Sequence, residues 1–436
     1  MSVVTLLAAD ELISQPLACQ GGPKVIADTC EHDALFHWPH VTEEDIEAVV
    51  RVMRAGTFSG LDESKAFEKE WGEYLGTPYN LTYPNGTLAL QVAMYVAGVR
   101  RGDEVICPSM TYWGSIGQCF TLGATPVFAD IDPRTLCIDP NDVERHISDR
   151  SRAIMVVHYC GHPCDMDPIM AIARKRGLKV IEDVSHAHGA LYKGRMVGAI
   201  GDVSAMSMMC AKSLPIGEGG MLSTRDRQMY EQAIAYAHYA RHGELEDEEL
   251  RKYAGVPWGG IKGRLNQTCA AMGRVQLRHY PRRMGQMQSA LNRFWDLLED
   301  VPGLRPHRTT TNSGSTMGGW YNPVGLYAPE ELGGLTVRKF IEAVNAEGGR
   351  CGRGINFPLH LHPVFNDLDV FGDGKPTRVA FSTRDLRQPR GSLPASEAAS
   401  ERAFGVPCFR EDQPEIVELY ATAYRKVAMQ AQKLVD

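Results

Sequence analysis

The sequence predicts an α/β fold in which helices cover both faces of a mainly parallel sheet, followed by a smaller α+β domain. Short apolar segments rich in Val and Ile are separated by helical patterns, and the apolar residues within them do not alternate with polar ones. Such strands are buried on both faces, which is typical of parallel sheets. At 436 residues, the chain is long enough for a major core and a second, smaller one.

The chain opens with an extension, residues 1–34, to which the sequence assigns no role. Its apolar stretch has no basic leader and carries Asp10 and Glu11, so it does not resemble a signal peptide. A helix is expected from about residue 43, because Thr42 is a candidate cap and Gly56 a terminator. A second helix, SKAFEKEWGEYLG, follows. The strands expected after it are DEVICP, TPVFADI, AIMVVHY, LKVIED, VSAMSMM and GGMLSTR.

The character of the sequence changes after residue 226. A long helix and an acidic, then glycine-rich stretch lead to the helix NQTCAAMGRVQLRHY. The polar segment near 305–319 indicates a loop or hinge, and the helices TVRKFIEAVNAEGG and PEIVELYATAYRKVAMQAQKL follow it. We therefore expect a large domain over residues 35–285 and a small C-terminal domain over residues 286–436.

Composition argues against several classes of protein. The net charge of -7 gives no broad attraction to nucleic acid or anionic lipid, so neither partner is expected. No apolar run reaches the ~18 to 20 residues of a membrane-spanning helix. Eleven cysteines form no CxxC pair, which suits the reduced thiols of a cytoplasmic protein. Histidines and cysteines alternate along HYCGHPC without the paired spacing of a zinc site, so no metal is expected.

Two side chains at the ends of predicted strands indicate the chemistry. Asp183 ends the strand LKVIED, and Lys212 follows the strand VSAMSMM just before the turn GEGG. Ligands of open parallel sheets bind beyond the carboxyl ends of the strands. Pyridoxal 5'-phosphate (PLP) needs an amine to hold its aldehyde as a Schiff base and a carboxylate to keep its pyridine nitrogen protonated. The alternatives are a solvated surface lysine and a carboxylate that only caps a helix.

Two further features lie at the same predicted sheet edge. Asn85-Gly86-Thr87 precedes an apolar helix, where glycine admits a phosphate to the backbone and the helix N-terminus attracts it. NGT is also a common helix cap. His186 follows Asp183 by three residues and could hydrogen-bond the ring hydroxyl of PLP, or it could be a packed core histidine.

Taken together and in order, the motifs of this chain resemble those of the DegT/DnrJ/StrS sugar aminotransferase family. The resemblance covers roughly residues 38 to 430. It implies a fold type I enzyme and a homodimer with active sites at the subunit boundary. It also implies transfer of an amino group from glutamate or glutamine to a keto-sugar or keto-cyclitol. The motifs are PNGTLAL, GDEVICPSMTY, GATPVFADIDPRTLCID, VHYCGHPCDMD, VIEDVSHAHGA, GEGGML, RLNQTCAAMGRVQL and FPLHLHPVF.

The resemblance also implies residue roles. Lys212 matches the Schiff-base lysine, Asp183 the partner of the pyridine nitrogen, and His186 the residue that contacts the ring hydroxyl. Tyr112 matches the aromatic that stacks on the cofactor, with Trp113 as the competing candidate. The positions that match phosphate contacts are Gly86, Thr87 and Ser207.

Two features of the sequence depart from the family pattern, and one further position is a candidate substrate contact. Lys262 stands where the family commonly has an asparagine that reaches the phosphate of the neighbouring subunit. Lysine there could supply a charge to the phosphate or point into solvent. Met208, Met209 and Cys210 stand where the strand before the lysine commonly ends in aromatic or histidine side chains, which suggests a differently shaped pocket. His360, in FPLHLHPVF, matches a segment near the substrate.

The sequence leaves the acceptor open. The dipeptide WP and the segments CDMD and AHGA resemble glutamine:scyllo-inosose aminotransferases. The general pattern also fits aminotransferases that act on nucleotide-linked 3- or 4-keto sugars. A sugar dehydratase on the same scaffold is disfavoured, because that branch replaces the lysine. A PLP-binding regulator without catalysis is the remaining alternative.

Overall fold

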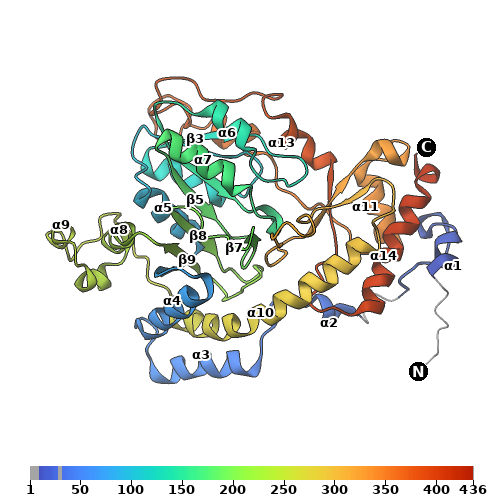
Figure 1. Cartoon of the computed structure of the whole chain (residues 1–436), viewed down its shortest axis with the longest axis horizontal. Helices are drawn as coiled ribbons and strands as arrows, with labels where there is room; N and C mark the ends of the chain where they lie inside the picture. The colour runs from blue at the N-terminus through green and yellow to red at the C-terminus, as the bar shows by residue number, and fades with distance from the viewer. Residues whose placement is uncertain (1–8, 28–31, 436) are drawn as a thin grey trace.

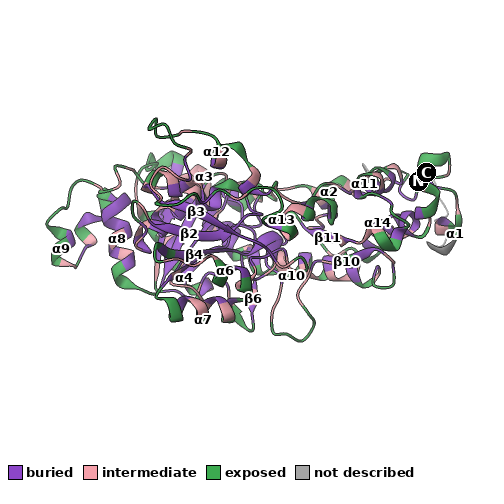
Figure 2. Ribbon diagram, turned by 90° about the horizontal axis from the view of Figure 1, so that it is seen from above, coloured by how far each residue is buried: buried purple, intermediate pink, exposed green. Residues whose placement is uncertain are grey.

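The computed structural model describes residues 9–27 and 32–435, which form two bodies joined by one long helix, α10 (Gln267–Asp296) (Figure 1). Each body has its own cluster of buried hydrophobic residues. In Figure 2 these residues gather along the central sheet and again around α14 (Pro414–Met429) in the smaller body. None of the described helices is both long and apolar enough to cross a bilayer.

The central sheet confirms the predicted α/β class. Its seven strands run in the order β1-β9-β8-β5-β4-β2-β3, and all neighbours are parallel except the pairs that β9 makes with β1 and β8. The sequence prediction missed β1, which carries polar residues in YNLTY. The strand bounds are β1 (Tyr79–Tyr83), β2 (Glu104–Pro108), β3 (Thr125–Ala129), β4 (Ser151–Val157), β5 (Lys179–Asp183), β8 (Val203–Ser207) and β9 (Gly220–Thr224).

Helices pack on this sheet and alongside one another. The first, α3, begins after Thr42 and ends before Gly56, as predicted, and Thr42 forms a capping box with Asp45. Packing places α5 against β5, β8 and β9, and places α7 against β5. The bounds are α3 (Glu43–Ala55), α4 (Asp62–Leu75), α5 (Gly86–Val96), α6 (Pro140–His146), α7 (Met166–Arg176) and α8 (Arg227–Ala237).

Helix α10 is longer than the sequence suggested, because it continues through Pro281. A proline inside a helix costs about 3 kcal/mol, so the pattern alone favours a helix that stops at residue 280. In the structure, α10 packs on α3 and α4 in the larger body and on α14 in the smaller one. Contacts at both ends stabilise one continuous helix.

The smaller body is an antiparallel sheet covered by helices. Its strand order is β10-β11-β12, and the predicted helices near its sheet are α11 and α14. The predicted loop at 305–319 largely lies between β10 and β11. The bounds are β10 (Leu304–Pro306), β11 (Val324–Tyr327), β12 (Ala403–Gly405) and α11 (Val337–Ala346).

The two clusters do not follow the chain in order. Leu12, Leu17 and Leu35 from the N-terminal segment belong to the smaller cluster. Phe365 and Leu393, from the C-terminal third, belong to the larger one. The division at residues 285 and 286 falls inside α10 and stays a prediction.

A buried ion pair fastens the N-terminal segment to the smaller body. Glu347 and Lys426 have fully buried side chains, and Lys426 Nζ lies 3.0 Å from Glu347 Oε2. Glu347 also accepts hydrogen bonds from the backbone N–H groups of Ala18 at 2.7 Å and Val25 at 3.2 Å. Lys426 donates to the Pro23 carbonyl at 2.9 Å. Because one carboxylate serves three donors, the segment and the small core depend on each other.

Candidate active site

A cavity of about 390 Å³ lies at the carboxyl ends of the parallel strands. Val157 ends β4, Asp183 ends β5 and Ser207 ends β8, and all three line this cavity. Parallel strands bring their carboxyl ends to one edge of a sheet, which is why residues distant in sequence meet here. The opposite wall comes from the smaller body and includes Tyr321 and Arg353.

Lys212 enters this cavity from the turn after β8. Its side chain is largely buried, and burial lowers the pKa of its amine to about 8, although Asp183 and Cys160 oppose the shift. The Nζ atom lies 3.7 Å from the centre of the Tyr321 ring. The indole Nε1–H of Trp38 donates to the Lys212 carbonyl oxygen at 2.9 Å. Because its surroundings are largely apolar, the Lys212 amine loses its proton at a lower pH than a free lysine does.

Two donors orient the carboxylate of Asp183. The Ser115 hydroxyl donates to Oδ2 at 2.7 Å, and the Ser185 backbone N–H donates to Oδ1 at 3.0 Å. Asp183 is only 3 % exposed, and that exposure faces the cavity. The carboxylate is therefore fixed in direction before any ligand arrives.

The N-terminus of α5 forms a cradle for an anion. The Asn85 side chain caps the helix by accepting from Leu88 N at 2.8 Å. Gly86 follows, and a Cβ atom there would stand only 2.7 Å from Ser207. Only glycine permits this approach of α5 to β8. Gly86, Thr87 and Ser207 all line the cavity, where free N–H groups and hydroxyls can bind a phosphate.

Aromatic rings border the same space. Tyr112 lines the cavity and is 49 % exposed, so one of its faces is available for stacking. The His186 ring lies 4.5 Å from that of Tyr321. Its pKa is held well below the usual range, first by burial and then by the charge of Lys212. A neutral His186 can still donate a hydrogen bond to a ring hydroxyl or accept one from it.

The structure does not bring three predicted residues to this cavity. Trp113 neighbours Tyr112 but faces solvent at 51 % exposure. Lys262 is exposed in the segment before α10, and its contact with a neighbouring subunit stays a prediction. His360 is fully buried, is bonded to Ser109 and Glu397 and does not line the cavity, so its contact with substrate stays a prediction.

Sequence reasoning missed several residues of the site. Ser115 stands three residues after Tyr112, but nothing in the sequence linked it to Asp183. Tyr321 and Arg353 come from the smaller body, and only tertiary packing brings them to the cavity. Along HYCGHPC, His158 is bonded to the buried Glu182. Among the residues that the structure describes, no cluster of three or more acidic, histidine or cysteine side chains could hold a metal ion.

These residues fit PLP. A buried amine of lowered pKa, an oriented carboxylate and a glycine-lined cradle for a phosphate share one cavity. Such a site, on a mainly parallel seven-stranded sheet followed by a smaller body, defines a PLP-dependent enzyme of fold type I.

Comparison with known proteins extends this conclusion. The DegT/DnrJ/EryC1/StrS aminotransferase family matches residues 39–418. The L-glutamine:2-deoxy-scyllo-inosose aminotransferase of Streptomyces lividus is 32% identical over 347 residues, 78% of this chain and 76% of that protein. The GDP-perosamine synthase of Caulobacter vibrioides is 33% identical over 304 residues, 69% and 78% respectively. The X-ray structure of the aminotransferase from Psychrobacter cryohalolentis superposes with a TM-score of 0.78 at 29% identity, covering 91% of this chain and 99% of that one.

The chain belongs to the DegT/DnrJ/EryC1/StrS aminotransferase family. It is a PLP-dependent aminotransferase, and the resemblance read from the motifs is confirmed.

The lowered pKa of Lys212 predicts how the apoprotein takes up PLP. Only the neutral amine attacks the aldehyde, so the rate of covalent incorporation should rise with pH through about 8, well below the value near 10.5 of a free lysine. Stopped-flow absorbance of apoprotein mixed with PLP measures this rate. Because Asp183 raises the pKa of Lys212, Asp183→Asn should move the midpoint to lower pH. A midpoint near 10 in both proteins would contradict the burial argument.

Proposed function

We propose that the protein transfers the amino group of glutamate or glutamine to a keto-cyclitol of the inosose type or to a related keto-sugar. The observation that carries the proposal is the shared cavity of Lys212, Asp183 and the α5 cradle. Bound there, PLP would supply an electron sink for the carbanion formed at the amino carbon. Borohydride reduction of the PLP-loaded protein should fix the cofactor on Lys212, and labelling of another residue would refute this role.

Residues that line the cavity have separate roles in this proposal. Lys212 Nζ takes and returns the proton at the reacting carbon, because an amine with a pKa of about 8 exchanges protons readily near neutral pH. Asp183, oriented by Ser115, keeps the pyridine nitrogen protonated. Gly86, Thr87 and Ser207, which line the cavity, would bind the phosphate, and the ring of Tyr112 would stack on the heterocycle.

We propose further that Arg353 binds a carboxylate of the amino donor. Its exposed guanidinium lines the cavity and forms no ion pair with any described residue. It comes from the smaller body, opposite the strand ends that carry Asp183 and Ser207. An unpaired guanidinium in the same cavity as the Lys212 amine suits the planar, bidentate recognition of a carboxylate.

Arg353→Gln should therefore raise the apparent Kd for glutamate by about 10- to 100-fold, since a hydrogen-bonded charge pair contributes about 1.5–3 kcal/mol. Spectral titration of the first half-reaction measures this value. Titration with an amino-inositol, which has no carboxylate, should change little. Arg338→Gln, on the exposed face of α11, is the matched control. Equal losses with both amines would rule out carboxylate recognition.

The choice of acceptor rests on the inosose aminotransferase of Streptomyces lividus and on the WP, CDMD and AHGA segments. The similarity to a GDP-perosamine synthase supports the second candidate, a nucleotide-linked keto sugar. Spectral titration with an amino-inositol and with a nucleotide-linked amino sugar separates them, since the natural amine should bleach the PLP absorbance. Bleaching by the nucleotide sugar alone would overturn the cyclitol proposal.

We also propose that the protein is a homodimer with shared active sites. Lys262 would then reach the phosphate bound by the partner subunit, as the family pattern implies for its position. The proposal is supported by the exposure of Lys262, which does not line the cavity of its own chain. Light scattering should give twice the chain mass, and a monomeric active protein would contradict it.

A further inference from the structure

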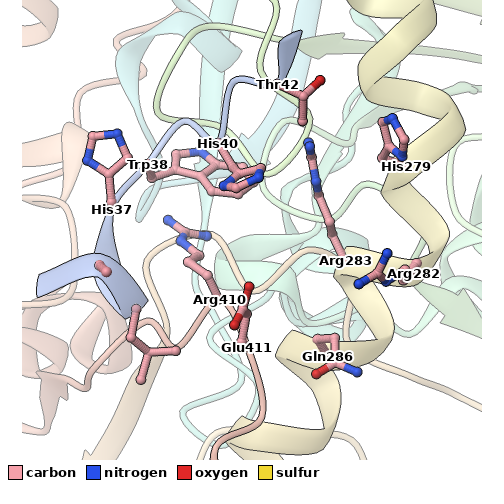
Figure 3. A pocket seen from close by; sticks show the side chains of 12 residues that line it. His37, Trp38, His40, Thr42, His279, Arg282, Arg283, Gln286, Arg410 and Glu411 are labelled. Carbon is pink, nitrogen blue, oxygen red and sulfur yellow. The ribbon is translucent and has the colours of Figure 1, made fainter. Parts of the chain in front are cut away.

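A second cavity, of about 210 Å³, lies between the segment before α3, the middle of α10 and the loop before α14 (Figure 3). We call it the arginine pocket. None of the residues that line it lines the active-site cavity. Trp38, Arg410 and Glu411 line it together with four residues of α10.

The sequence of α10 builds one wall of this pocket. His279, Arg282, Arg283 and Gln286 are spaced three and four residues apart, so they share one face of the helix. Figure 3 shows Arg410 on the other side of the cavity, carried by the loop before α14. Three arginines and one carboxylate, that of Glu411, thus line the same cavity.

The guanidinium groups are incompletely satisfied. Arg282 and Arg410 form no ion pair with any described residue, and Arg410 Nε is buried without a hydrogen-bond partner. Arg283 is half-buried and donates to Gln276. Burial lowers the pKa of Arg283 and the charge of Arg282 lowers it further, while Asp45 opposes the shift. Positive charge gathered without matching acceptors favours an anionic ligand.

Trp38 holds Arg410 in place. The guanidinium lies 4.1 Å from the centre of the indole ring. The indole N–H is already committed to the Lys212 carbonyl oxygen at 2.9 Å. The ring therefore acts as a platform that aligns Arg410, and its own N–H is not available to a ligand.

We propose that the arginine pocket binds a phosphate-type oxyanion, either free phosphate or the phosphoryl group of a larger metabolite. A tetrahedral dianion accepts hydrogen bonds from several directions, which suits guanidinium groups on opposite walls. Only the chemistry of the phosphoryl oxygens is assigned, and it is common to both sources. The site lies outside the cavity that holds PLP and the reacting substrate.

Calorimetry of the PLP-loaded protein with inorganic phosphate, at constant ionic strength, tests this proposal without relying on turnover. Arg282→Gln and Arg410→Gln should each weaken binding by about 10-fold or more. Arg410→Lys should recover part of the affinity, since it keeps the charge but loses the planar fork. Arg278→Gln is the matched control, because Arg278 lies on the same helix, pairs with Glu44 and does not line the pocket.

Competition identifies the source of the phosphoryl group. Displacement of phosphate by a sugar phosphate or a nucleotide-linked sugar at lower concentration would assign the pocket to a metabolite, and binding of phosphate alone would assign it to the free ion. Both results support the site. Absence of saturable phosphate binding, or equal weakening by Arg278→Gln and Arg410→Gln, would overturn it. Failure of the amino-transfer assays would leave these binding data unaffected.

Discussion

Lys212→Ala is expected to lower kcat by at least about 10³-fold, because the variant loses both the covalent anchor and the group that moves the proton. The fold should persist, since the substitution removes a buried ammonium group whose desolvation is unfavourable. PLP should still bind through the α5 cradle and Asp183, and its absorbance should become that of a non-covalent complex. Steady-state rates and the visible spectrum of the purified variant measure both effects.

Lys69→Ala is the appropriate control, because the Lys69 side chain is 78% exposed on α4. It should keep the activity of the unaltered protein. A small amine added to Lys212→Ala should restore part of the rate by acting as the missing base. If Lys212→Ala kept a tenth or more of the activity without such an amine, Lys212 could not be the proton carrier.

Glu347→Ala is expected to destabilise the protein by about 3–5 kcal/mol, the cost of leaving one member of a buried ion pair unmatched. The variant strands the Lys426 ammonium in the small core and frees the backbone N–H groups of Ala18 and Val25. Urea denaturation measures the change in the free energy of unfolding. Limited proteolysis should also release the segment 9–27 earlier than in the unaltered protein.

Two further variants serve as controls for this prediction. Glu342→Ala, on the exposed face of α11, should cost no more than about 0.5 kcal/mol, since its partner Arg338 is also exposed. Glu347→Leu combined with Lys426→Met should recover much of the loss, because no charge then remains buried. Equal midpoints for Glu347→Ala and Glu342→Ala would show that the buried pair does not hold the segment.

The sequence alone determined the class of fold and the central chemistry. Six of the seven strands were visible because each carries a short apolar run, whereas the polar residues of β1 hid it, and the parallel order follows from helices between strands. Asp183 and Gly86 were identified because Asp183 ends a strand and Gly86 begins a helix, and Lys212 because it follows a strand in the turn before GEGG. Parallel strands bring such positions together.

Tertiary structure decided the rest. Arg353 and Tyr321 reach the cavity because the smaller body packs across the strand ends, and His360 lies outside the lining of the cavity, where it contacts Ser109 and Glu397. In the arginine pocket, Arg410 stacks on the ring of Trp38, and Glu347 accepts a hydrogen bond from Ala18 in the N-terminal segment. His360 and Ser109 are 251 residues apart and Ala18 and Glu347 are 329 apart, and no local period encodes such contacts. They arise only when the packing of two cores and α10 positions distant backbones side by side.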